Sequence, residues 1–104
     1  MNKQIEFEVK EKTYVLEYNR SGIRRAEAAG LDLSNLNKVV TTPTTLFYGA
    51  LIKHQPDMTI DKADELYDAV ADTELVKELS DMAVACIEMM YDGKPKNAKW
   101  KIVK

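Results

Sequence analysis

Apolar and polar residues alternate over the first part of the chain. The apolar positions are Ile5, Phe7 and Val9 in a first run and Tyr14, Leu16 and Tyr18 in a second. A period of two with one polar face is typical of an antiparallel strand that packs one side on a core. We expect a β-hairpin over residues 3–18, with its turn at Glu11 and Lys12. Two strands alone are marginally stable in water, so this hairpin should lie on helices.

The remainder of the chain carries helical signals. A helix over residues 20–29 is capped by Asn19 or Ser21 and ends at Gly30, which tolerates the left-handed backbone of a helix end. Residues 34–40 form either one turn of helix or an apolar loop. We expect an α+β fold, in which an N-terminal antiparallel β-hairpin packs on four to five α-helices.

Three further helices follow. The first covers residues 43–54, with Thr42 as its cap and Pro43 at its first position. The second covers residues 60–72 and is capped by Thr59, and the third covers residues 74–91 and is capped by Thr73. We expect one domain over residues 1–92, followed by a flexible basic tail over residues 93–104.

The helix over residues 43–54 is apolar almost all round. Tyr48 and Ile52 point away from the face that carries Leu46 and its apolar neighbours. Such a helix is either central in its domain or held at an interface between proteins. Gly49 sacrifices ~1 kcal/mol of helix propensity relative to alanine, and the close approach of another backbone would explain it.

The last helix has a broad apolar stripe, from which some side chains depart. Val84 and Tyr91 lie off this stripe and Met89 lies at its edge. Methionine is ordinary core filling and is also used at adaptable binding surfaces, so both interpretations stay open. The candidate partner-binding residues on the two apolar helices are Tyr48, Ile52, Val84, Met89 and Tyr91.

An acidic stripe is predicted on the helix over residues 60–72. Its members, all candidate partner-binding residues, are Asp61, Asp64, Glu65, Asp68 and Asp72. Like charges three or four residues apart destabilise a helix by ~0.2–0.5 kcal/mol per pair. The stripe is either a solubilising face or a docking surface for a basic partner, one candidate being the lysine-rich tail of this chain or of another copy.

Charge is distributed unevenly over the 104 residues, whose net charge is −2. Residues 57–92 carry 11 acidic and 2 basic side chains, whereas residues 93–104 carry five lysines and no acid. The acidic middle would repel nucleic acid, which is bound through clustered Lys and Arg. No segment has the apolar length of a membrane span or of a signal peptide, so we expect no membrane partner. The single cysteine, Cys86, allows no internal disulfide.

The sequence offers little that could support catalysis. Its one histidine, His54, and its one cysteine, Cys86, cannot supply the four ligands of a structural zinc site. Cys86 falls within an apolar helical stripe, where thiols are usually inert, and His54 near a helix end is explained by the helix dipole. The four glycines are too far apart for a phosphate-binding loop. We therefore expect no enzymatic activity, no cofactor and no metal.

The order of these elements narrows the choice. The hairpin is followed by residues 19–33 (NRSGIRRAEAAGLDL), 43–51 (PTTLFYGAL) and 58–66 (MTIDKADEL). Over residues 3–91 this arrangement resembles the tail assembly chaperones of long-tailed bacteriophages and prophages. The resemblance implies a protein of the host bacterial cytoplasm, absent from the mature virion, that binds the tape-measure protein and recruits the tail-tube protein. The lysine-rich tail lies outside the resemblance, and we expect the chain to self-associate.

Two other classes stay open. A small helical regulator or antitoxin-like dimer would need a helix-turn-helix with basic residues on its second helix. Only Arg20, Arg24 and Arg25 cluster here, and residues 34–40 carry just Lys38. An enzyme subunit or small-molecule binder would need a dry pocket with convergent polar groups.

Overall fold

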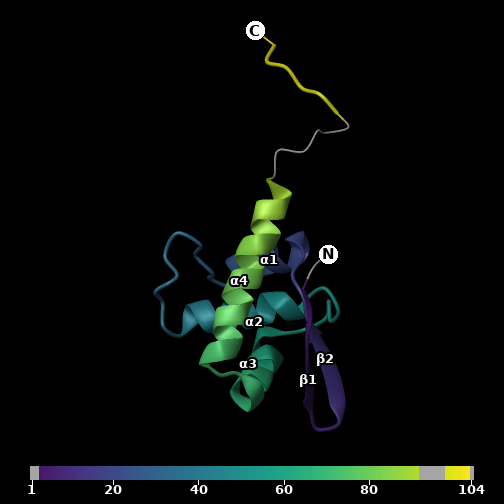
Figure 1. Cartoon of the computed structure of the whole chain (residues 1–104), viewed down its shortest axis with the longest axis vertical. Coiled ribbons are helices and arrows are strands. Elements are labelled where there is room, and N and C mark those ends of the chain that lie inside the picture. The colour runs from purple at the N-terminus through teal and green to yellow at the C-terminus, as the bar shows by residue number, and fades with distance from the viewer. Residues whose placement is uncertain (1–2, 92–97, 104) are drawn as a thin grey trace.

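A hairpin and four helices follow one another along the chain in the computed structural model, which describes residues 3–91 and 98–103. The elements are β1 (Ile5–Val9), β2 (Lys12–Leu16), α1 (Arg20–Ala28), α2 (Thr41–Leu51), α3 (Ile60–Val70) and α4 (Thr73–Met90). The hairpin lies along one side of the helices, and α4 runs the length of the helical part (Figure 1). This α+β architecture confirms the predicted fold class, with four helices in the described ranges.

The hairpin pairs its strands antiparallel, with Phe7 opposite Tyr14 and Val9 opposite Lys12. Its turn therefore consists of Lys10 and Glu11, one residue earlier than predicted. Both have positive φ, 51° and 67°, as a two-residue type I′ turn requires. The ring of Phe7 stacks on that of Tyr14 within the hairpin, at 5.2 Å between centroids, and packs inward in a tilted arrangement against Phe47 of α2, at 5.5 Å.

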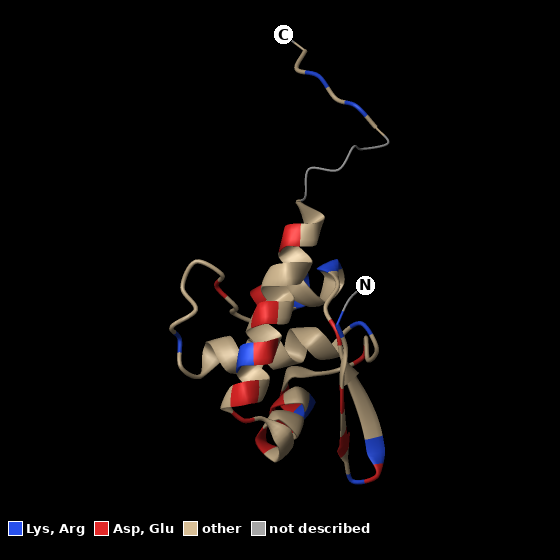
Figure 2. Ribbon diagram, viewed as in Figure 1, with Lys and Arg blue, Asp and Glu red and all other residues tan. Residues whose placement is uncertain are grey.

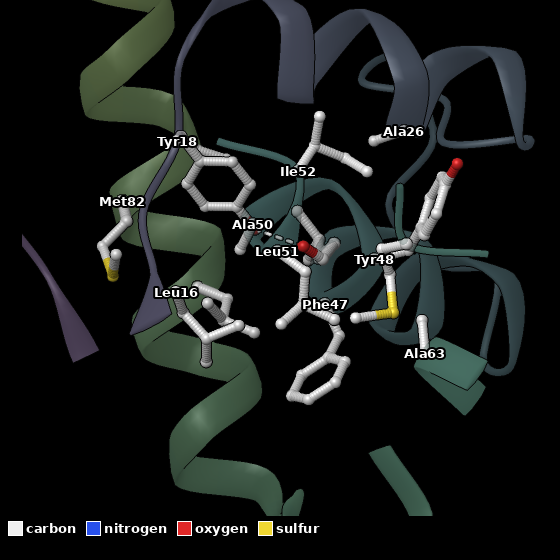
Figure 3. Close-up of a cluster of buried hydrophobic side chains, with 14 of the residues drawn as sticks. Leu16, Tyr18, Ala26, Phe47, Tyr48, Ala50, Leu51, Ile52, Ala63 and Met82 are labelled. Carbon is white, nitrogen blue, oxygen red and sulfur yellow. Dashed lines mark hydrogen bonds between the residues drawn. The ribbon is translucent and has the colours of Figure 1, made fainter. Parts of the chain in front are cut away.

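Helix α2 occupies the centre of the fold and contacts α1, α3, α4 and β2. Figure 3 shows the side chains of α2 reaching toward elements on several sides. Tyr48 is only 7 % exposed and Ile52 only 3 %. The prediction that these two residues bind a partner is therefore wrong, because neighbours within the same chain already cover both faces of this helix.

The predicted start of α2 is also wrong. The helix begins at Thr41 and its cap residue Val40 supplies no side-chain hydrogen bond. Thr42 is buried instead of capping, and Pro43 lies in the first turn, where a missing N–H is tolerated. The hydroxyl of Thr45 donates back to the carbonyl of Thr41 at 2.6 Å. The helix ends at Leu51, three residues before the predicted end, and residues 31–40 form turns and loop rather than a helix.

Each of the other three helices begins after a residue whose side chain caps it. The side chains of Asn19 and Thr59 accept hydrogen bonds from Gly22 N and Lys62 N, as predicted for α1 and α3. Asp72 rather than Thr73 caps α4, and its side chain accepts from Leu75 N at 2.8 Å. A carboxylate at this position also gains from the positive end of the helix dipole. Gly30 has φ +118° at the end of α1, in the left-handed region that the sequence predicts for it.

The C-terminal residues 98–103 form neither helix nor strand, and their described side chains are exposed. They lie beyond the end of α4, at the end of the molecule opposite the hairpin turn (Figure 1). The domain limit is predicted at residue 92, which lies outside the described residues. Residues 93–97 and 104 of the predicted tail also lie outside them. Within the described ranges, no helix combines the length and the apolarity that crossing a bilayer requires.

Candidate functional site

An exposed apolar patch surrounds the last two turns of α4. Val84 is 43 % exposed, Met89 57 % and Tyr91 82 %. We call these three residues the α4 patch. The rest of the helix is anchored, since Leu79, Met82 and Ala83 are buried against the core. The helix therefore presents these side chains from a rigid base. The exposure of Val84 and Tyr91 agrees with their predicted position off the apolar stripe, and for Met89 it decides between the two interpretations that the sequence left open.

A half-open hollow of about 530 Å³ adjoins this patch. It lies where α1 faces the end of α4, and Tyr91 belongs to both the hollow and the patch. Its apolar lining comes from Ile23, Leu33, Ile87, Met90 and Tyr91, and its charged rim from Arg20, Arg24 and Glu27. The volume falls within the ~300–1,000 Å³ of binding pockets and suits a few apolar side chains. Because Tyr91 belongs to both, we take the patch and the hollow together as the candidate docking surface.

Most residues of this hollow were not predicted as site residues. Leu33 comes from the loop after α1, and a loop position has no periodicity that would place it. Arg20 and Arg24 are four residues apart on α1, a spacing that puts them on one helix face. Arg25 has a different role: its guanidinium donates to the hydroxyl of Tyr48 at 2.7 Å and to the carbonyl of Met58 at 3.3 Å.

Four of the five residues of the predicted acidic stripe lie on α3 and are exposed, whereas Asp72 lies outside this helix. Asp61, Asp64, Glu65 and Asp68 lie on the outer side of α3, while Ala63 and Leu66 are buried. Asp72 does not belong to this stripe, because α3 ends at Val70 and Asp72 caps α4. Figure 2 shows acidic residues on both α3 and the adjoining part of α4.

The structure does not bring the acidic stripe and the α4 patch together. α3 leads directly into the start of α4, whereas Tyr91 follows its last residue. An 18-residue helix such as α4 is ~27 Å long. The two predicted binding regions therefore lie near opposite ends of α4.

Glu17 is a buried charged residue that the sequence analysis missed. Lys53 Nζ donates to one carboxylate oxygen at 2.7 Å, while Gln4 Nε2 and His54 Nε2 lie 2.8 Å from the other. These contacts lower the pKa of Glu17 from its ordinary value of 4.5 to about 2; the hydrogen bond from Lys53 has the largest effect, and burial opposes it. Alternation along β2 gives no hint of partners that lie 36 and 37 residues away.

This cluster joins the end of β2 to the end of α2. The backbone N–H of Glu17 also donates to the carbonyl of Ala50 at 2.9 Å. His54 is thus explained by the carboxylate of Glu17, and the predicted explanation from the helix dipole alone is incomplete. Cys86 is partly buried, and burial raises the pKa of its thiol, which reduces the reactive thiolate form. Across the described ranges no three His, Cys, Asp or Glu side chains cluster in a way that could hold a metal ion.

These features define a small α+β protein, in which a hairpin and three helices surround the fourth helix, α2, and the end of α4 exposes apolar side chains. The chain belongs to the family described as a domain of unknown function, DUF5055, whose model matches residues 1–103. The match includes the C-terminal segment as well as the folded part. Searches of curated proteins and of solved structures find no match.

Proposed function

We propose that this protein is a non-enzymatic tail assembly chaperone of a long-tailed bacteriophage or prophage. It acts in the host bacterial cytoplasm, binds the tape-measure protein, assists recruitment of the tail-tube protein and is left out of the mature virion. The proposal rests on the resemblance of residues 3–91 to such chaperones. The observation in the structure that supports it best is the exposed α4 patch beside the hollow between α1 and α4, which Tyr91 joins.

This surface suits an amphipathic helix. Helical clients insert apolar side chains spaced three and four residues apart into a groove of the partner. Met89 and Met90 are flexible side chains that adapt to different apolar partners. The rim of Arg20, Arg24 and Glu27 offers charges of both signs to the polar flanks of the client. A tape-measure protein, with its long exposed apolar stripes, is a client of this chemistry.

The acidic stripe gives a second, weaker contribution in this proposal. A client helix of 20 residues spans ~30 Å, which is enough to reach from the α4 patch to α3. Asp61, Asp64, Glu65 and Asp68 are exposed, so their effect should be screened by salt. They would keep the complex in solution and favour basic client segments.

Co-expression of the full chain with the tape-measure protein of the same phage or prophage tests the proposal. Tyr91→Asp should abolish co-purification, because it places an unpaired charge in the apolar contact. Asp64→Asn with Asp68→Asn changes α3, which lies near the other end of α4, and should weaken binding modestly and reduce its sensitivity to salt. Failure of the wild type to bind, or equal binding by every variant, would contradict the proposal.

The regulator class is less well supported. A helix-turn-helix would need a second, basic helix soon after α1, whereas residues 31–40 form turns and loop. Arg25, one of the three clustered arginines, is engaged with Tyr48 and the carbonyl of Met58. These observations favour a protein-binding surface over a recognition helix for nucleic acid.

A further inference from the structure

The outer edge of β1 has backbone groups free to pair with another strand. In a two-residue hairpin the residues that flank the turn, here Val9 and Lys12, form a hydrogen-bonded pair, and alternate pairs follow. The N–H and C=O groups of Glu6 and Glu8 therefore point away from β2. No backbone hydrogen bond to either residue from outside the hairpin is found in residues 3–91 and 98–103. Such an edge is a template for an added strand.

The two faces of β1 at this edge differ in chemistry. Glu6 and Glu8 are exposed on the outer face. On the inner face Phe7 is buried, but Ile5 and Val9 are only half-buried. An added strand would therefore meet negative charge on one face and, on the other, the exposed parts of Ile5 and Val9, which otherwise pack against the core. A second copy of β1 does not fit, because identical strands would bring glutamates together.

The C-terminal segment has the complementary pattern. Lys99 and Lys101 alternate with Trp100 and Ile102, which are 86 % and 77 % exposed. A stretch with a period of two places both lysines on one face of a strand and both apolar side chains on the other. Large apolar side chains exposed on an extended segment are costly in water, so the segment has reason to dock.

We propose that residues 98–103 of one copy add as a β-strand to the β1 edge of a second copy. Trp100 lies beside Phe7 in this pairing, and Lys99 and Lys101 lie beside Glu6 and Glu8. Both parallel and antiparallel addition allow this register, because the alternation is symmetric about Trp100. The apolar side chains then cover Ile5 and Val9.

A second copy is a better acceptor than the same chain. Residues 98–103 lie beyond the C-terminal end of α4, while β1 runs toward the opposite end of the molecule (Figure 1). The α3 stripe is a poorer site, since a helix offers no backbone partners to an extended segment. Reciprocal exchange between two copies closes a dimer, and exchange in one direction only extends a chain of copies.

Trp100 is the only tryptophan, so its fluorescence reports this docking directly. Sedimentation velocity of the full chain should show mass above 11.8 kDa that rises with concentration. The tryptophan emission should shift to the blue over the same concentrations. Glu6→Lys with Glu8→Lys, and separately Lys99→Glu with Lys101→Glu, should each raise the dissociation constant about tenfold or more, because attractive cross-strand pairs become repulsive.

Mixing the two charge-reversed proteins is the decisive step. In the mixture each tail meets an oppositely charged β1, so association and the blue shift should return. Lys38→Glu with Lys77→Glu, at exposed sites elsewhere, changes the net charge by the same amount as Lys99→Glu with Lys101→Glu and should leave association unchanged. Tyr91→Asp at the α4 patch should also leave it unchanged. Trp100→Ser should weaken association without involving charge.

Four results would overturn the proposal. The first is a wild-type monomer with unshifted emission at high concentration. The second is a blue-shifted emission at monomeric mass, which would mean docking within one chain. The third is a charge-reversed mixture that does not recover its association. The fourth is self-association that Tyr91→Asp abolishes while Lys99→Glu with Lys101→Glu, and Trp100→Ser, both retain it.

Discussion

Gly22 and Gly49 face each other where α1 packs against α2. A Cβ placed on Gly22 would lie 2.4 Å from the carbonyl oxygen of Gly49, and one placed on Gly49 would lie 2.8 Å from the carbonyl oxygen of Gly22. Both distances are too short for carbon and oxygen in contact. The two backbones are therefore as close as they are because neither residue has a side chain, as the sequence predicts for Gly49.

Gly49→Ala should accordingly destabilise the protein. In an isolated helix this change would stabilise by ~1 kcal/mol. Here the new methyl group also lies 2.8 Å from the Cβ of Ala26, and such overpacking costs ~1–3 kcal/mol. Urea unfolding at neutral pH measures the difference. Ser21→Ala, at an exposed position of α1, is the control and should change stability by less than ~0.5 kcal/mol. A more stable Gly49→Ala variant would show that α1 can move away.

Glu17 should make stability depend on pH in the acid range. Its pKa is about 2 in the folded state, below its ordinary value of 4.5. The stabilisation is therefore complete above pH 4.5 and is lost as the pH falls toward about 2, because the unfolded chain takes up the proton first. The free energy of unfolding, measured from unfolding curves at several values between pH 7 and pH 3, should fall less steeply with decreasing pH for Glu17→Gln than for the wild type. Glu27→Gln, at an exposed position, should retain the wild-type slope, and equal slopes for all three would contradict the prediction.

The hydroxyl of Tyr48 should contribute measurably to stability. It accepts hydrogen bonds from Arg25 Nη2 at 2.7 Å and from Nε at 3.1 Å. Tyr48→Phe removes this acceptor and should destabilise by ~1.5–3 kcal/mol, the range for hydrogen bonds to charged groups. Tyr91→Phe removes a hydroxyl from an exposed ring and should have no measurable effect. Equal thermal midpoints for both variants would mean that water replaces the lost contact.

A substitution in the hairpin turn should stabilise the protein. Lys10 and Glu11 both adopt positive φ, which side chains disfavour and glycine does not. Glu11→Gly should therefore stabilise the protein by ~0.5–1 kcal/mol, and the thermal midpoint should rise by several degrees. Lys12→Gly, one residue later and within β2, is the matched control and should destabilise. A lower midpoint for Glu11→Gly would mean that the Glu11 side chain contributes more than its backbone strain.

Local patterns were sufficient for much of this fold. The alternation of Ile5, Phe7 and Val9 predicts β1 correctly, because each apolar residue of a strand faces the core directly. Asn19 and Thr59 predict their helix starts because capping involves neighbours three residues apart. The exposed positions of Val84 and Tyr91 follow from their distance from the apolar stripe of α4.

The choice between Asp72 and Thr73 as a cap shows where local patterns become ambiguous. Both side chains can accept a hydrogen bond from a free N–H, and adjacent candidates differ by one residue in the helix start. This ambiguity also assigned Asp72 to the wrong helix, and the predicted hairpin turn was likewise displaced by one residue. Small shifts of this kind change which surface a side chain belongs to.

The sequence by itself determined the hairpin, the approximate ranges of the four helices and the positions of Val84 and Tyr91 off the apolar stripe of α4. It also offered a close backbone neighbour as the explanation of Gly49. Only the tertiary structure decided that Tyr48 and Ile52 are buried, that Glu17 meets Lys53 and His54, and that Leu33 completes a hollow beside Tyr91. The physical reason is that strand alternation, helix periodicity and capping act over a few residues. Which apolar face is covered, and which charge finds a partner, depends on segments far apart in the chain that meet only when it folds.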